Sequence, residues 1–104
     1  MLTLNLDNQA EIQFNKLLKY SGMDFSKLIN SMLTYRINEL KKGIQNIKND
    51  LVKYENKYNM KSPVFYKSYL KGDFEEDSDS NDFMIWSGEY EVYTEFKEEL
   101  NQLQ

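Results

Sequence analysis

The feature that most constrains this chain is an uninterrupted apolar seam that runs from about residue 25 to about residue 59. Apolar residues recur there at spacings of three and four, which indicates an amphipathic helix and, over about three heptads, a coiled coil. They are Phe25, Leu28, Ile29, Met32, Leu33, Ile37, Leu40, Ile44, Ile47, Leu51, Tyr54 and Tyr58. The spacing predicts one helix of about 35 residues, roughly 52 Å long at 1.5 Å per residue. Gly43 lies inside it and, at a cost of about 1 kcal/mol relative to alanine, marks a weak point or a bend.

A shorter helix is predicted before this seam. Asp7 or Asn8 would cap it, and Asn8 with Glu11 has the spacing of a capping box. Gly22 suits the left-handed residue that ends such a helix, and Asp24 is the expected cap of the long helix that follows.

Two further elements are predicted after the seam. Ser62 and Pro63 have the pattern of a helix N-cap and first turn, and Gly72 would close this short helix. Residues 73–82 are acidic and serine-rich, which predicts a loop or a disordered linker, and a last helix is expected from about residue 81. The apolar face of that last helix would comprise Phe83, Trp86, Tyr90, Tyr93, Phe96, Leu100 and Leu103.

The first six residues alternate between apolar and other side chains, which predicts a β-strand. The inward set is Leu2, Leu4 and Leu6, and the outward set is Met1, Thr3 and Asn5. A lone strand leaves its backbone groups without partners, so we expect it to pair antiparallel with the same strand of a second copy. The alternative is an N-terminal extension that pairs with nothing.

The N-terminal part of the chain resembles the ribbon-helix-helix family of DNA-binding dimers. The resemblance is carried by this strand, the helix containing Phe14, Leu17 and Leu18, the turn at 21–23 and the start of the next helix at 24–29. The resemblance covers residues 1–40. It implies a mainly α fold whose N-terminal β-strand pairs in a dimer, followed by an extended second helix. It also implies that the strand pair reads DNA bases and that helix N-termini hold phosphate.

The resemblance assigns two sets of residues. The expected DNA-binding residues are Met1, Thr3, Asn5, Lys16, Lys19, Phe25, Ser26 and Lys27. The expected dimerisation residues are Leu2, Leu4, Leu6, Leu28, Ile29, Leu33, Ile37, Leu40 and Ile44. One departure is that the outward face of the strand carries no lysine or arginine, so phosphate attraction would depend on the helices.

Charge is divided unevenly along the 104 residues, whose formal net charge is −4. Residues 1–54 carry eight basic and five acidic side chains, whereas residues 55–104 carry five basic and twelve acidic ones. Such asymmetry indicates two surfaces with different partners, and the alternative is a chance distribution over solvated helix faces. We expect two regions, residues 1–59 for dimerisation and DNA binding and residues 60–104 for binding a partner protein.

The acidic second half is also rich in aromatic residues, and the combination with the N-terminal pattern resembles antitoxins of type II toxin–antitoxin pairs. The residues expected to bind a toxin are Phe65, Tyr66, Tyr69, Phe74, Phe83, Trp86, Tyr90, Tyr93 and Phe96. Tryptophan and tyrosine are common anchors of interfaces, and an acidic segment complements the basic cleft of a ribonuclease. The alternative is that this aromatic face folds back on the chain's own long helix.

The chain contains no cysteine and no histidine, which excludes disulfides, Cys/His zinc sites, histidine-based triads and cysteine nucleophiles. Residues 77–81 begin like a calcium loop, but Asp82 stands where glycine is needed and Gly88 where glutamate is needed. We therefore expect no enzyme activity, no metal and no cofactor. Neither a membrane-spanning run nor a signal segment is evident, so the expected compartment is the cytoplasm.

The function expected from these patterns is that of an antitoxin. It would neutralise a cognate toxin, expected to be a ribonuclease, through its C-terminal region and would regulate its own operon by binding operator DNA. The alternative is a coiled-coil dimeric adaptor that does not bind DNA.

Overall fold

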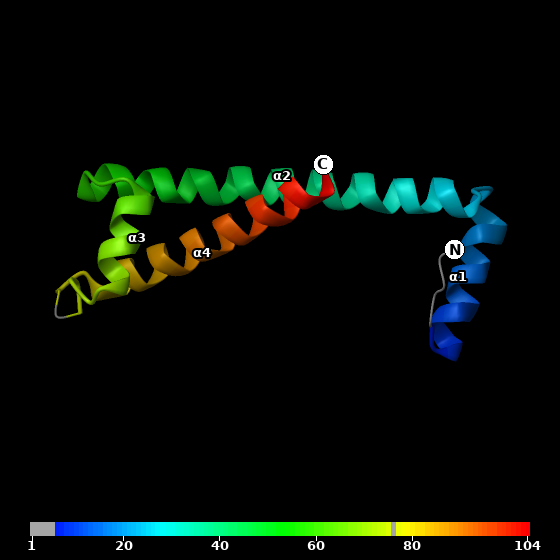
Figure 1. Ribbon diagram of the computed structural model, residues 1–104, viewed down its shortest axis with the longest axis horizontal. Helices are drawn as coiled ribbons and strands as arrows, with labels where there is room; N and C mark the ends of the chain where they lie inside the picture. The colour runs from blue at the N-terminus through cyan, green and yellow to red at the C-terminus, as the bar shows by residue number, and fades with distance from the viewer. Residues whose placement is uncertain (1–5, 76) are drawn as a thin grey trace. The chain divides into compact units, whose positions relative to one another are not determined.

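The computed structural model describes residues 6–75 and 77–104, which form four α-helices joined by short turns (Figure 1). They are α1 (Asn8–Ser21), α2 (Phe25–Tyr58), α3 (Ser62–Leu70) and α4 (Ser80–Leu103). The long helix predicted from the apolar seam is therefore confirmed almost to the residue.

The ends of α1 and the start of α2 follow the predicted capping residues. Asp7 is the N-cap of α1, where its Oδ1 accepts a hydrogen bond of 2.7 Å from the backbone N–H of Ala10. Gly22 ends the helix with a φ of 70°, which is the left-handed region that glycine adopts without strain. The Oδ1 of Asp24 accepts a bond of 2.8 Å from the Lys27 N–H, so α2 begins at Phe25.

The start of α3 differs slightly from the prediction. Lys61 is the N-cap, and Ser62 is already helical, with Pro63 in the first turn. The Ser62 N–H donates instead to Oε2 of Glu55 on α2, at 2.8 Å. A side chain from a neighbouring helix thus satisfies one of the amide groups that a helix start leaves unpaired, which sequence alone does not reveal.

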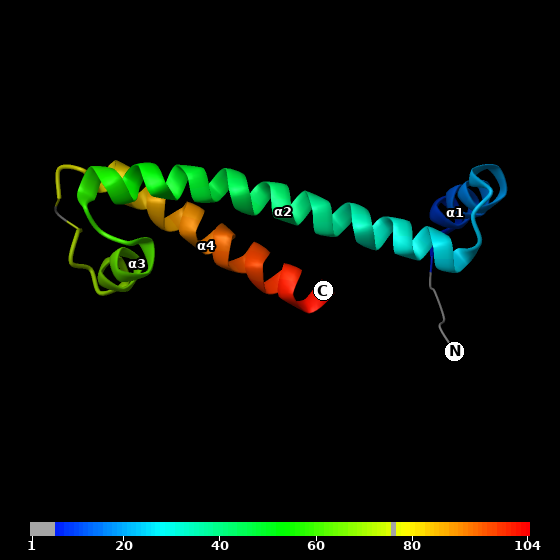
Figure 2. The same ribbon diagram turned by 90° about the horizontal axis from the view of Figure 1, so that it is seen from above.

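The chain divides into two compact units, and the division falls within α2. The N-terminal unit is Met1–Arg36 and the C-terminal unit is Ile37–Gln104. Within the C-terminal unit, α4 runs back along α2 in the opposite direction (Figures 1 and 2). Helix α3 lies between the C-terminal end of α2 and the N-terminal end of α4. The unit begins well before residue 59 because residues 43 to 58 of α2 contact α4.

The predicted fold class needs a correction. The described residues contain no β-strand: Leu6 is exposed and lies outside any regular element, and α1 begins two residues later because Asp7 caps it. The other residues of the predicted strand, 1–5, lie outside the described part of the chain. The mainly helical part of the prediction agrees with the structure, but the ribbon-helix-helix architecture does not.

None of the helices in the described part of the chain has an apolar stretch long enough to cross a membrane.

Candidate interaction surfaces

The core of the C-terminal unit is built from aromatic rings. Phe65 on α3 and Trp86 on α4 are fully buried, and their rings are parallel with centroids 3.7 Å apart. Tyr54 and Tyr58 of α2 also stack on Trp86, at 5.7 and 5.8 Å, and Phe83 lies between Tyr58 and Phe65. Three helices therefore meet on a single tryptophan.

A buried hydrogen bond fixes this tryptophan. The indole N–H of Trp86 donates to the hydroxyl oxygen of Ser62 at 2.8 Å, and both residues are buried. A buried donor without a partner costs about 1–3 kcal/mol. The indole ring is therefore held where its N–H can reach the Ser62 hydroxyl.

Eight of the nine residues predicted to bind a toxin form this core. Phe65, Phe83 and Trp86 are buried, and five are half-buried around them: Tyr66, Tyr69, Phe74, Tyr90 and Tyr93. The ninth, Phe96, is half-buried farther along α4, beside Gly43 of α2. The aromatic face folds back on the long helix, which was the alternative interpretation of the sequence. Contact of the three buried rings with a partner would require this core to open.

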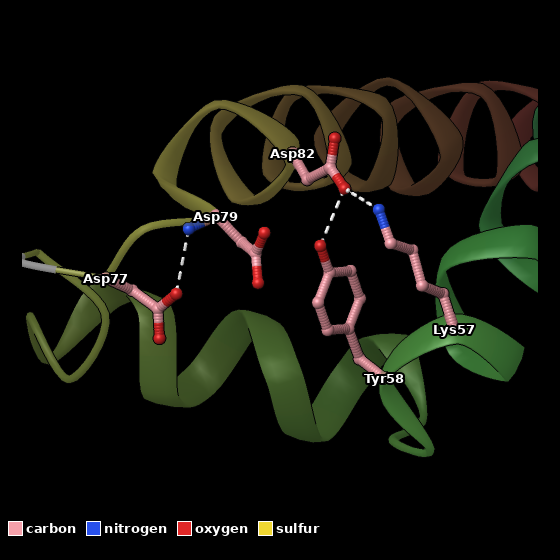
Figure 3. A network of polar contacts seen from close by, with 5 residues as sticks. All are labelled: Lys57, Tyr58, Asp77, Asp79 and Asp82. Atoms are coloured by element: carbon pink, nitrogen blue, oxygen red, sulfur yellow. Dashed lines mark hydrogen bonds and ion pairs between the residues drawn. The ribbon is translucent and has the colours of Figure 1, made fainter.

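A polar network joins the start of α4 to the end of α2 (Figure 3). Lys57 Nζ and the Tyr58 hydroxyl both donate to Oδ2 of Asp82, at 2.7 and 2.6 Å. These two bonds lower the pKa of Asp82, and the same carboxylate raises the pKa of Lys57 to about 12. The network ties the two helices together at the surface beside the aromatic core.

A second carboxylate at the interface of α2 and α4 is in a less favourable position. Burial raises the pKa of Glu89, and the Asp50 carboxylate of α2 raises it further. Oε2 of Glu89 is buried and has no hydrogen-bond partner among the described residues. The ionised pair therefore opposes the packing of the two helices.

The C-terminal unit also contains a groove of about 730 Å³ between α2 and α4, next to the start of α3. Leu51, Val52, Pro63, Tyr93 and Leu100 supply its apolar lining, and lysines and glutamates line it as well. Because its charged lining carries both signs, it has no preference for either sign of charge in a ligand.

The N-terminal unit has a different surface. Leu28 is the one buried apolar side chain among residues 6–36, and α1 has no buried residue. Phe14 of α1 and Phe25 of α2 meet edge to face with centroids 5.8 Å apart. The large apolar side chains left exposed in this unit are Leu6, Ile12, Leu17, Tyr20, Met23, Ile29, Met32, Leu33 and Tyr35.

The residues predicted to bind DNA and to form a dimer are spread over several environments. Lys16, Lys19, Ser26 and Lys27 are exposed and Phe25 is half-buried, whereas Met1, Thr3 and Asn5 lie outside the described residues. Of the dimerisation set, Leu6, Ile29 and Leu33 are exposed, Ile37 and Ile44 are half-buried, Leu28 and Leu40 are buried, and Leu2 and Leu4 are not described.

A further surface, the outer face of α4, was not predicted from the sequence. We define this outer face as Met84, Ile85, Gly88 and Val92, whose three apolar side chains are 59, 42 and 38% exposed. They lie at spacings of three, four and seven residues on the side of α4 opposite Trp86 and Tyr90. The signal was present as a second apolar stripe, but the stronger aromatic stripe on the same helix obscured it.

A set of metal ligands or a similar known protein could each define a further site. Among residues 6–75 and 77–104, no three acidic side chains are placed so that they could hold a metal ion. No protein-family model, curated protein or solved structure matches this chain.

Proposed function

We propose that this chain is a protein-interaction module that self-associates through its N-terminal unit. The observation that carries the proposal is the exposed apolar surface of α1 and the start of α2, which residues 6–36 leave uncovered. Leu17 and Tyr20 are 54 and 78% exposed and line a hollow of about 650 Å³ on α1.

A second copy is the partner that this surface fits best. A pair of helices that buries one leucine gains too little from the hydrophobic effect to hold its own packing, so a covering surface is needed. The first 36 residues carry four basic and three acidic side chains, so two copies of the unit would meet without strong charge repulsion. A two-fold interface then lets each copy cover the apolar face of the other.

Sedimentation velocity over a range of protein concentrations tests this proposal. We expect the full chain to form a dimer and Leu17→Glu to shift it to monomer, because a charge on the apolar face cannot be buried without a partner. Asn15→Glu adds the same charge at an exposed polar position of α1 and should remain a dimer. Self-association that persists unchanged in Leu17→Glu, or a monomeric parent chain, would contradict the proposal.

A second candidate function is that of an antitoxin, and the charge of the C-terminal unit favours it. Residues 37–104 carry nine basic and fourteen acidic side chains, so this unit would attract a basic protein such as a ribonuclease toxin. DNA binding is not included, because the reading of bases was predicted for the strand pair, and residues 6–75 and 77–104 contain no strand. The test is co-expression with the product of the neighbouring gene: growth arrest by that product should be relieved by this chain, and arrest that continues would exclude the function.

A further inference from the structure

We propose that the outer face of α4 is a docking surface for a basic amphipathic helix of a partner protein. The inference rests on the proposed function, since it identifies a second surface through which the interaction module would act. It is independent of the self-association surface, which lies in the N-terminal unit.

Helix α4 is apolar on two opposite sides. Phe83, Trp86 and Tyr90 point into the core of the C-terminal unit, where α2 and α3 cover them. Met84, Ile85 and Val92 lie on the other side and remain exposed. A helix at the surface of a domain normally has one apolar stripe, so a second stripe indicates a second packing partner.

Gly88 lies in the middle of the exposed stripe. A glycine inside a helix costs about 1 kcal/mol relative to alanine. Nothing in the described chain lies within 4 Å of where a Cβ at Gly88 would be, whereas the same atom at Gly43 would lie 2.9 Å from the Phe96 ring. Internal packing therefore explains why residue 43 is glycine but not why residue 88 is. The missing side chain at Gly88 would let a partner helix approach closely.

The charge along α4 is mostly negative. Helix α4 carries six acidic residues and one basic residue, Lys97. By helical periodicity, Glu91, Glu95 and Glu98 follow one border of the stripe and are exposed, whereas Glu89 is half-buried and faces Asp50 of α2. Lys97 lies on the opposite side, where its Nζ is 5.3 Å from the centre of the Tyr93 ring.

These charges select the occupant. A second copy of α4 would place acidic borders against each other, which opposes pairing. A helix with an apolar stripe and lysine or arginine on its flank would bury the stripe and neutralise this acidic border. The carboxylates are not used up within the chain: Glu91 accepts one bond from the Tyr66 hydroxyl and Glu98 one from Gln102, and each carboxylate can accept more.

The experiment is a titration of the full chain with a fluorescent 18-residue helical peptide of leucine and lysine, followed by anisotropy. The control peptide has glutamate in place of each lysine. We expect the basic peptide to bind and the acidic one not to bind. Val92→Gln removes apolar surface without changing charge, and should weaken binding about fivefold or more, the loss typical of an interface anchor.

Val52→Gln is the matched control, because Val52 is a comparably exposed valine on α2 that lines the groove. It should leave the affinity unchanged. Failure of the basic peptide to bind, equal effects of the two substitutions, or a loss confined to Val52→Gln would each overturn the proposal.

Sedimentation of the same variants separates this inference from the proposed function. Val92→Gln should self-associate as the parent chain does. A parent chain that is monomeric yet binds the basic peptide through Val92 would refute self-association and support the docking surface. A dimer that does not bind the peptide would refute the docking surface alone.

Discussion

The two units of the chain are both helical, but their apolar residues are used differently. In the C-terminal unit, a return helix and a short connecting helix bury Phe65 and Trp86 completely. In the N-terminal unit, Phe14 of α1 meets Phe25 of α2, and nine large apolar side chains of residues 6–36 are exposed. The comparison shows that amphipathic helices alone do not make a core, which requires enough helices to cover each stripe.

Side-chain size accounts for much of this difference. Nine of the fifteen aromatic residues follow Lys61. Each aromatic ring buries more apolar surface per residue than a smaller side chain does. The N-terminal unit depends on leucine, isoleucine and methionine spread over two helices. It therefore needs an external surface, and the C-terminal unit does not.

The largest expected effect is the loss of the central ring of the C-terminal unit. Trp86→Ala should lower the free energy of unfolding by about 3–5 kcal/mol, because it leaves a cavity against Phe65 and Tyr54. In the Leu17→Glu background, which should be monomeric, Tyr35→Ala in the N-terminal unit removes a ring that is 71% exposed and should change it by less than about 0.5 kcal/mol. Urea denaturation measures both, and similar losses would erase the contrast between the units.

A smaller effect is expected at the hydrogen bond of this tryptophan. Ser62→Ala should lower the free energy of unfolding by about 1–3 kcal/mol, because the Trp86 indole N–H is left buried and unpaired. Ser26→Ala, at an exposed position of the N-terminal unit, is the control and should be nearly neutral. A neutral Ser62→Ala would show that the position of Trp86 is fixed by ring packing alone.

The close approach of α2 to α4 can be measured with a double-mutant cycle. Gly43→Ala should raise the free energy of unfolding by about 1 kcal/mol when Phe96 is also alanine, from helix propensity alone. In the parent background the added methyl group meets the Phe96 ring, so the gain should be lost. Thermal unfolding of the four proteins should give a coupling of about 1 kcal/mol, and additive effects would mean that the helices are not in contact there.

The smallest expected effect is stabilising and depends on pH. Because the pKa of Glu89 is raised in the folded chain, its ionisation opposes folding as pH rises above its ordinary value near 4.5. Glu89→Gln should therefore raise Tm slightly at pH 7, and the gain should disappear below pH 4.5, where the carboxyl is protonated in both states. Glu95→Gln, at an exposed position on the same helix, is the control. A gain that is equal at both pH values would contradict the assignment.

Local signals in the sequence predicted the helices well. The caps at Asp7, Gly22 and Asp24 depend on residues within one turn, and the α2 seam depends on a regular period, so both can be identified without tertiary information. The strand was a wrong prediction because alternation over six residues is a weak signal, and the Asp7 cap begins a helix immediately after it.

The surfaces were harder to predict than the elements. The aromatic stripe of α4 has the same spacing whether it covers a partner or the chain's own α2, and only the fold shows that Phe65 and Tyr54 occupy both sides of Trp86. The outer face was missed because two apolar stripes on one helix look like general hydrophobicity. The Glu55 bond to Ser62 joins separate helices and has no local pattern.

Hydrogen exchange followed by mass spectrometry over a dilution series tests the central contrast most directly. We predict that amides of α3, α4 and residues 44–58 keep the same protection at every protein concentration, because their unit has its own core. Amides of residues 8–36 should lose protection on dilution, because a second copy covers their apolar face. Protection that is independent of concentration in both units would contradict the account, as would protection that declines equally in both.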